Sequence, residues 1–180
     1  MKRSLVRYTF KDCLKDPESI LPINRTILKE RDAKPLIEEL SKKVPGTKLA
    51  SIKGRVEVEK IGDSEVVFVE GTPLAVRRAG LLIPSLVNNE SLNTLPRIVV
   101  DMGAVPHICG GADVMAPGIR KIEGEFGEGG LVSVVDERHG KFLAVGQSLA
   151  DSKTLRATKK GKVVKNLHYV GDEVWESVKS

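Results

Sequence analysis

The chain has 180 residues, of which 41% are hydrophobic and 29% are charged, and these proportions exclude an intrinsically disordered protein. Its formal net charge of +5 is a mild excess, which permits binding to a polyanion without requiring it. The longest nearly apolar run, Ala79 to Val87, is too short to span a membrane.

The cysteine content and the N-terminal residues indicate the compartment. Cys13 and Cys109 are the only cysteines, and their spacing fits neither a metal site nor a redox motif, which is typical of a reducing compartment. No apolar stretch suited to a signal peptide precedes Lys11 and Asp12. We therefore expect a cytoplasmic protein with no membrane segment. Gln147 is the only glutamine among many Lys, Arg and Glu residues, which favours a thermophilic source.

The first half of the chain predicts an α+β domain. Asp32 is suited to cap a helix that has Pro35 in its first turn and ends at Pro45–Gly46. Alternating apolar and charged residues then predict strands, with turns at Gly62–Asp63 and Gly71–Thr72. The expected strands are 5–10, 56–61, 66–69 and 74–76, and residues 80–87 are expected to form a short helix interrupted near Pro84.

A polar, turn-rich cluster at residues 88–94 separates two regions, and we place the domain boundary near Leu95–Pro96. This division gives domains 1–95 and 96–180. The second region predicts several short strands with frequent glycine turns, which is typical of a small closed barrel. Its expected elements are a strand at 98–100, a short helix from about Gly103, a hairpin of 131–135 with 141–145, a helical stretch at 152–158 and a strand at 163–164.

Residues with the potential for chemistry do not form a catalytic or metal-binding set. The glycine-rich segment Gly124–Gly130 lacks the Lys and Ser/Thr of a Walker loop, so it is interpreted as a turn between strands. His107 and Cys109 lack further ligands nearby, and zinc needs about four. Asp101 follows a strand and precedes a helix start, where an N-cap belongs. The sequence therefore predicts no catalytic residue, no metal and no cofactor.

Positive charge gathers in one segment. Six Lys and Arg residues and no acid lie between Lys153 and Lys165, whereas acids outnumber bases from Arg97 to Asp151. Such a run can bind phosphates, although a solvated surface without a partner has the same appearance.

The segment Asp101–Ile119 resembles the signature of PUA domains, the modules of pseudouridine synthases and archaeosine transglycosylases. The matching residues are Gly103-Ala104, Gly111-Ala112-Asp113-Val114-Met115 and Pro117-Gly118-Ile119, with further matches at 143–146, 161–164 and 168–172. Upstream, Gly80, Pro84, Ser85 and Leu86 and the strands of 56–76 resemble the pre-PUA domain of the malignant-T-cell-amplified-sequence family. The resemblance implies an archaeal relative in which an α+β pre-PUA domain precedes a mainly β PUA pseudo-barrel.

In that family the protein has no catalytic domain, and it works with tRNA and the ribosomal small subunit in translation initiation or ribosome recycling. The resemblance thus implies a non-catalytic binder of structured RNA (tRNA or rRNA), with a partner similar to density-regulated protein. A targeting subunit of an RNA-modification enzyme and a protein-interaction adaptor remain alternatives. The expected RNA-contact residues, chosen for small size or positive charge, are Gly103, Ala104, His107, Gly110, Gly111, Ala112, Arg120, Lys121, Lys159, Lys160 and Lys162.

Overall fold

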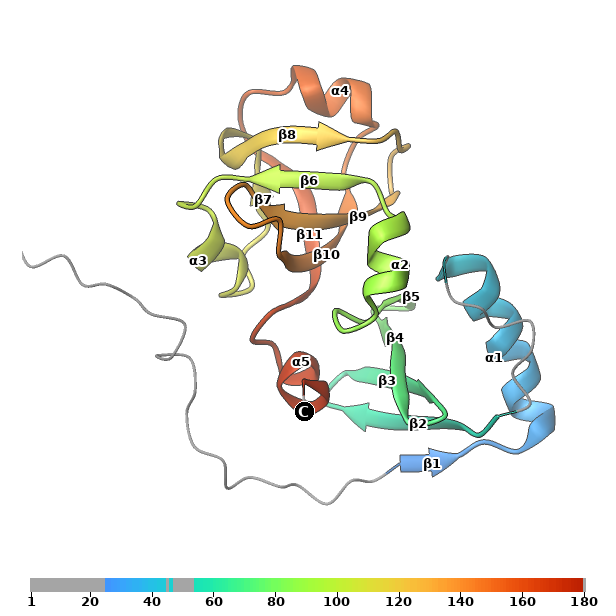
Figure 1. Cartoon of the computed structure of the whole chain (residues 1–180). Coiled ribbons are helices and arrows are strands. Elements are labelled where there is room, and N and C mark those ends of the chain that lie inside the picture. The colour runs from blue at the N-terminus through green and yellow to red at the C-terminus, as the bar shows by residue number, and fades with distance from the viewer. Residues whose placement is uncertain (1–24, 45, 47–53, 180) are drawn as a thin grey trace, which may run out of the picture.

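The computed structural model describes residues 25–44, 46 and 54–179, which form two sheets (Figure 1). The expected strand at 5–10 lies outside these residues. The first sheet is an antiparallel meander, in which every strand pairs with its neighbours in the sequence. Its strands are β1 (Arg25–Ile27), β2 (Val56–Ile61), β3 (Ser64–Val69), β4 (Thr72–Arg78) and β5 (Leu81–Pro84).

The helix predicted over residues 80–87 is wrong, because Leu81–Pro84 forms β5. Ala79 and Gly80 both have positive φ, 50° and 76°, as a two-residue hairpin turn requires. The turn returns the chain along β4, where Ile83 pairs with Val76. A short apolar run fits a buried strand as well as a helix, so local periodicity could not decide between them.

Helix α1 (Glu30–Lys43) packs on one face of this sheet. It begins two residues before the predicted cap at Asp32, with Lys29 as an N-cap that makes no side-chain hydrogen bond. Leu40 and Val44 pack with Val67 of β3, whereas the adjacent Val66 faces a different core cluster on the other side of the sheet. Residues 66–69 are therefore core residues and expose no apolar patch to a partner.

The second sheet has the strand order β7-β11-β10-β9-β6-β8, in which the β6–β9 pair is parallel and the others are antiparallel. The predicted hairpin and the helical stretch after it are confirmed as β9, β10 and α4. The elements are α2 (Asn89–Thr94), β6 (Arg97–Val100), α3 (Val105–Ile108), β7 (Val114–Met115), η3 (Ala116–Gly118), β8 (Ile119–Glu123), β9 (Leu131–Asp136), β10 (Phe142–Ser148), α4 (Ser152–Ala157) and β11 (Lys162–Tyr169).

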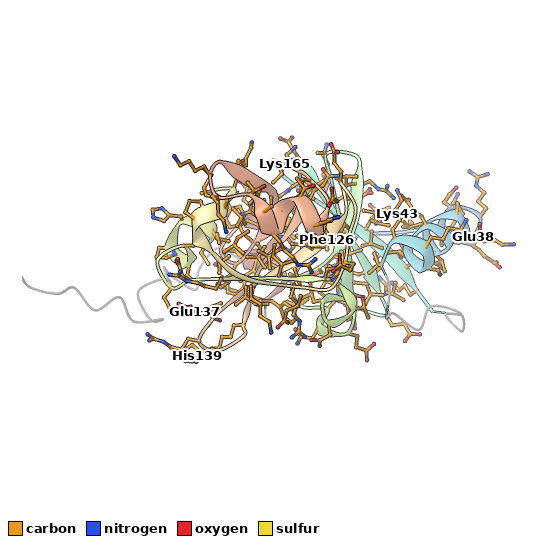
Figure 2. All side chains as sticks on the ribbon, turned by 90° about the horizontal axis from the view of Figure 1, so that it is seen from above. Glu38, Lys43, Phe126, Glu137, His139 and Lys165 are labelled. Carbon is orange, nitrogen blue, oxygen red and sulfur yellow. The ribbon has the colours of Figure 1, made fainter. Side chains whose placement is uncertain are left out.

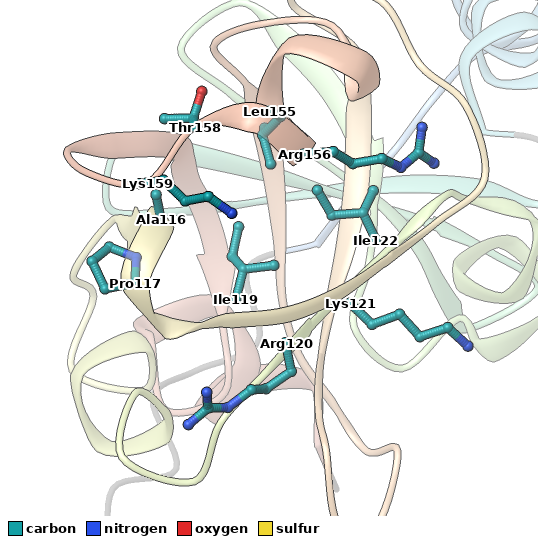
Figure 3. A pocket seen from close by; sticks show the side chains of 10 residues that line it. All are labelled: Ala116, Pro117, Ile119, Arg120, Lys121, Ile122, Leu155, Arg156, Thr158 and Lys159. Carbon is teal, nitrogen blue, oxygen red and sulfur yellow. The ribbon is translucent and has the colours of Figure 1, made fainter.

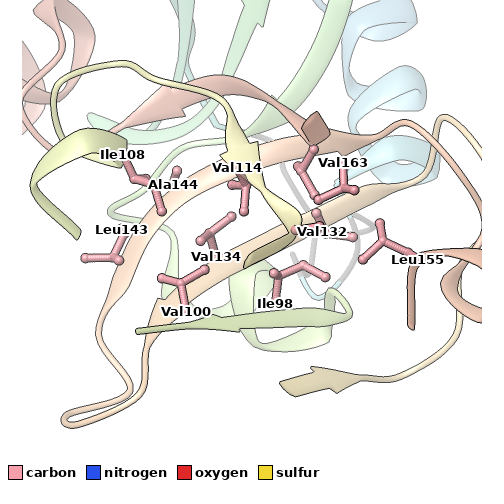
Figure 4. Packing of buried hydrophobic residues seen from close by; sticks show 12 residues of the cluster. Ile98, Val100, Ile108, Val114, Val132, Val134, Leu143, Ala144, Leu155 and Val163 are labelled. Carbon is pink, nitrogen blue, oxygen red and sulfur yellow. The ribbon is translucent and has the colours of Figure 1, made fainter. Parts of the chain in front are cut away.

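This sheet curves around a core of aliphatic side chains (Figure 4). Ile98, Val132, Val134 and Val164 are fully buried in it, as expected for a chain in which aromatics make up 4% of the residues. The mainly β pseudo-barrel is confirmed, but the expectation of full closure is not. Within the described residues no strand pairing joins β7 to β8, so the structure is a half-barrel with two open edges.

The two sheets share one hydrophobic cluster. Val66 and Ile83 of the first sheet pack in it with Val145 and Leu167 of the second. Helix α5 (Glu173–Val178) follows the last strand of the half-barrel, yet lies beside the first sheet, and Val174 joins the shared cluster (Figure 1). We propose the division at Leu95–Pro96, with α5 of the second domain docked on the first.

A buried polar cluster stabilises this contact between the sheets. The Oδ2 atom of Asp172 lies 3.0 Å from Nη1 of Arg78, in β4, and 2.8 Å from Nδ1 of His168, in β11. Arg78 also donates to the carbonyl oxygen of Leu167 at 2.8 Å, and Asp172 caps α5 by accepting the backbone N–H of Trp175 at 2.8 Å. His168 and Asp172 are buried, so one carboxylate connects three elements away from solvent.

The molecule is elongated. Glu38 and Lys43, on α1, lie at one end, and Glu137 and His139, in the β9–β10 turn, lie at the other (Figure 2). No helix within residues 25–44 and 54–179 is both long and apolar enough to cross a membrane.

Candidate nucleic-acid interface

The segment before α3 is organised by Asp101, which follows β6. Its Oδ1 atom accepts the backbone N–H of Ala104 at 2.8 Å, as an N-cap would, although the helix itself begins one residue later at Val105. A Cβ atom on Gly118 would lie 3.1 Å from Cβ of Ala104. Small residues therefore allow η3 to pack closely against the start of α3. Gly103 is exposed beside this contact.

Arg120 fixes the same segment from the other side. Its Nη2 atom lies 3.2 Å from Asp101 Oδ2, and its Nε atom lies 3.7 Å from Glu137 Oε2. Glu137 also accepts the backbone N–H of Met102 at 3.2 Å. The guanidinium of Arg120 is thus shared by two carboxylates, which weakens its attraction for a phosphate.

The glycine-rich loop after α3 is anchored on β11. Gly111 has φ of 88°, and a Cβ atom there would lie 2.8 Å from Oη of Tyr169. The Asn166 side chain donates to the carbonyl oxygens of Ile108 and Ala112 at 3.1 and 3.0 Å. Gly111 is therefore needed for a left-handed backbone and close packing on Tyr169. The prediction that it keeps a surface low for RNA is compatible with this geometry but is not tested by it.

Asp113 connects this loop to the basic segment. Its Oδ1 atom accepts the backbone N–H of Asn166 at 2.8 Å, and its Oδ2 atom lies 3.0 Å from Nζ of Lys162. Burial raises the pKa of Asp113, but the hydrogen bonds from Asn166 and Lys162 outweigh it, so the net pKa is lowered and the carboxylate stays ionised. Lys162 therefore already has a carboxylate partner within the structure.

Lys159 and Lys160 are exposed, and neither makes an ion pair within the part of the chain that the structure describes. Their turn lies against η3, because Ala116 donates its backbone N–H to the carbonyl oxygen of Gly161 at 2.9 Å. Met115, 50% exposed, lies opposite Lys162 in the β7–β11 register. We name the surface formed by α3, the loop 110–113 and the turn 159–162 the α3–β11 surface.

Ten of the eleven predicted contact residues lie on this surface or at its edge, and Lys121 does not. Lys121 pairs with Glu123 at 2.6 Å and points away from Arg120 (Figure 3). Lys165 projects from the opposite side of the molecule to His139 (Figure 2).

Sequence reasoning missed Asn166 and Tyr169, which hold the loop in place. Only the pairing of β11 with β7 and β10 gives them that role.

The described residues contain no group of three or more His, Cys, Asp or Glu side chains placed to hold a metal. His107 is exposed, and Cys109 is half-buried against the half-barrel core. The chemistry of the α3–β11 surface is therefore that of backbone groups, small residues and lysine ammonium groups, which suits binding.

Comparison with known families agrees with this geometry. Residues 96–170 match the PUA domain, and residues 24–88 match a domain of unknown function, DUF1947. The uncharacterized protein MJ1432 of Methanocaldococcus jannaschii is 38% identical over 153 residues, which are 84% of this chain and 94% of that protein. The chain belongs to the family of PUA-domain proteins with an N-terminal DUF1947 domain. The prediction that the chain is a PUA-domain protein with a preceding α+β domain of this family is confirmed.

Two eukaryotic proteins are also similar in sequence to this chain. Translation machinery-associated protein 20 of Saccharomyces cerevisiae is 26% identical over 68% of this chain and 72% of that protein. Human malignant T-cell-amplified sequence 2 is 28% identical over 62% of this chain and 65% of that protein. The crystal structure of protein PH0734.1 from Pyrococcus horikoshii has 35% identity and a TM-score of 0.70, covering 86% of this chain and 99% of that one.

A catalytic relative matches a smaller part. The probable tRNA pseudouridine synthase B of Pyrobaculum calidifontis is 36% identical over 76 residues, which are 42% of this chain and 22% of that protein. The similarity to this enzyme is thus confined to a length close to that of the PUA domain.

Proposed function

We propose that the protein is a non-catalytic, cytoplasmic RNA-binding factor of translation, which binds tRNA or rRNA through the α3–β11 surface. Its membership of a PUA family with translation machinery-associated relatives supports the role in translation. The observation that carries the choice of surface is the turn at Lys159–Lys160, whose exposed ammonium groups make no ion pair within the described residues. The turn is hydrogen-bonded to η3, and η3 packs through Gly118 against Ala104 at the start of α3. Phosphates bind such cations through counterion release, and small residues allow the RNA backbone to approach closely.

A filter-binding titration with tRNA and with rRNA fragments tests this proposal. Lys160→Glu should weaken binding about threefold to tenfold at low salt, and should make the slope of log K against log salt less steep by about one phosphate contact. Lys34→Glu on α1 is the matched control, because Lys34 is exposed and far from the α3–β11 surface. Absence of affinity for either RNA at low salt, or equal losses in both variants, would refute the proposal.

A second candidate is a targeting subunit for an RNA-modification enzyme, which acts without ribosomes. The partial match to tRNA pseudouridine synthase B favours it, since the same type of domain there accompanies catalysis. Purification of the tagged chain from its host separates the two functions. Recovery with ribosomal small subunits, or with a partner resembling density-regulated protein, supports translation. Recovery with a modification enzyme and without ribosomes supports the alternative.

A further inference from the structure

A pocket with a volume of about 310 Å³ lies between β8 and α4 and borders the α3–β11 surface at Lys159 (Figure 3). This volume is at the lower end of the range of ligand pockets, about 300–1,000 Å³, so it suits one large side chain better than an extended ligand. The pocket occupies the open side of the half-barrel, beside the edge strand β8.

The floor of the pocket is aliphatic. Leu155 of α4, 2% exposed, lies opposite Ile119 and Ile122, which both point from β8 toward α4 (Figure 3). Residues three apart in a regular strand would face opposite sides, but the β6–β8 register skips Arg120, and this β-bulge turns both isoleucines to the same side. No aromatic residue lines the pocket, although single-stranded nucleic acids bind mainly by stacking bases on aromatic rings.

The free edge of β8 adds backbone hydrogen-bonding groups. β8 pairs with β6 on one side, and in the described residues no strand pairs with its other side. Alternate residues of such an edge direct their N–H and C=O groups outward, where an extended peptide can add as a further strand.

The charged residues that line the pocket, Arg120, Lys121, Arg156 and Lys159, are all cationic and favour an acidic ligand. Lys121 is paired with Glu123 at 2.6 Å, and Arg156 is paired with Glu125 at 2.7 Å. These pairs make Lys121 and Arg156 less available to a ligand. Lys159 makes no ion pair within the described chain, and its side chain extends over the apolar floor (Figure 3). The pocket therefore offers one unpaired cation above an aliphatic socket.

We propose that this pocket, the β8 pocket, binds an extended acidic peptide of another protein. One large apolar side chain of the peptide enters between Ile119, Ile122 and Leu155, and a carboxylate two residues away, on the same face of the extended strand, pairs with Lys159. The peptide backbone bonds to the free edge of β8. Lys159 also belongs to the turn 159–162 of the α3–β11 surface, so the peptide and an RNA would compete for this one ammonium group.

The test is an NMR titration of the full chain with labelled Ile and Leu methyl groups. The probe is the blocked heptapeptide Thr-Glu-Thr-Leu-Thr-Glu-Thr, which should shift the methyl signals of Ile119, Ile122 and Leu155 in a saturable way. Replacing its Leu with Ala should weaken binding about tenfold or more, as expected for an apolar side chain that loses its buried site. Replacing both Glu residues with Lys should abolish the shifts.

Variants of the protein locate the contact. Thr158→Trp should fill the pocket and prevent binding, and Lys159→Glu should weaken binding about fivefold, as for a partly exposed ion pair. Lys153→Glu is the matched control, because Lys153 is exposed on α4 but does not line the pocket. If Thr158→Trp does not fold, Lys159→Glu decides, since it alters an exposed side chain.

Three results would overturn the proposal. The first is no saturable shift with the acidic peptide. The second is equal binding by wild type and Lys159→Glu. The third is a shift of the same methyl signals by heptauridylate RNA but not by the peptide, which would make the pocket part of an RNA site.

Discussion

Replacing Asp172 with Asn removes the charge from the buried cluster that connects the two sheets while keeping the shape of the side chain. Asn also caps helices about as well as Asp, so α5 keeps its N-cap. What is lost is the attraction between the carboxylate and Arg78, whose side chain is 27% exposed, and the charge-assisted hydrogen bond from His168. His168 is fully buried, and its Nε2 atom has no hydrogen-bond partner within the described residues.

Removing one partner of a buried ion pair costs about 3–5 kcal/mol. Because Arg78 retains some contact with water, we expect the lower end, a loss of about 3 kcal/mol in the free energy of unfolding. With a urea slope of about 2 kcal/mol/M, the midpoint should fall by about 1.5 M. Trp175, the single tryptophan of the chain, lies in α5 next to the cluster, so its fluorescence monitors the transition, with circular dichroism as a second probe.

Asp151→Asn is the matched control. Asp151 caps α4 in the same manner, accepting the backbone N–H of Thr154 at 2.9 Å, but it is exposed and pairs with no cation in the described structure. Its substitution should leave the midpoint unchanged. Equal losses in the two variants would refute the reasoning, because the effect of Asp172 would then come from capping rather than from its charge.

The pH dependence has a definite sign. Burial raises the pKa of Asp172, but the interaction with His168, the hydrogen bond from the backbone N–H of Trp175 and the guanidinium of Arg78 outweigh burial and lower the net pKa. A lowered pKa in the folded state means that the ionised carboxylate stabilises the protein above its unfolded pKa of about 3.9. The difference between wild type and Asp172→Asn should therefore be full at pH 7 and shrink as the pH falls below about 4.

Two further predictions concern single sites. Gly111→Ala should destabilise the protein more than Gly71→Ala. Both residues have positive φ, 88° and 80°, but a Cβ atom at Gly111 would meet Tyr169, whereas one at Gly71 would meet nothing within 4 Å. The urea midpoints of the two variants check this prediction, and equal losses would contradict it. Hydrogen bonds from Arg77 and then Lys43 lower the pKa of Glu39 to about 2. An NMR titration of its carboxyl should therefore give a midpoint near pH 2, and a midpoint near 4.5 would contradict the pairing seen here. The stabilisation of the fold by ionised Glu39 should be complete above pH 4.5 and be lost as the pH falls through about 2.

The fold was predictable where local pattern and family motif agree. Alternation over residues 56–61 identified β2, and the glycine turn at Gly140 identified the β9–β10 hairpin, because both are short-range features. The strand at 81–84 was not predictable from its own residues, since its state depends on the Ala79–Gly80 turn and on pairing with β4. The position of α5 against the first sheet depends on Arg78, 94 residues away from Asp172, which no local pattern reveals.

The basic run from Lys153 to Lys165 shows why the candidate site was harder to predict than the fold. In sequence it is one charge cluster, but the structure divides it between surfaces. Arg156 pairs with Glu125, Lys159 extends over the β8 pocket, and Lys162 pairs with Asp113 beside the loop after α3. The number of cations in a sequence segment therefore overstates the positive charge available to one ligand, because folding brings carboxylates close enough to pair with some of these cations. A lysine without such a neighbour in the described structure is the better candidate for a ligand contact, and charge reversal at Lys160 therefore tests the proposed RNA surface without disturbing an existing pair.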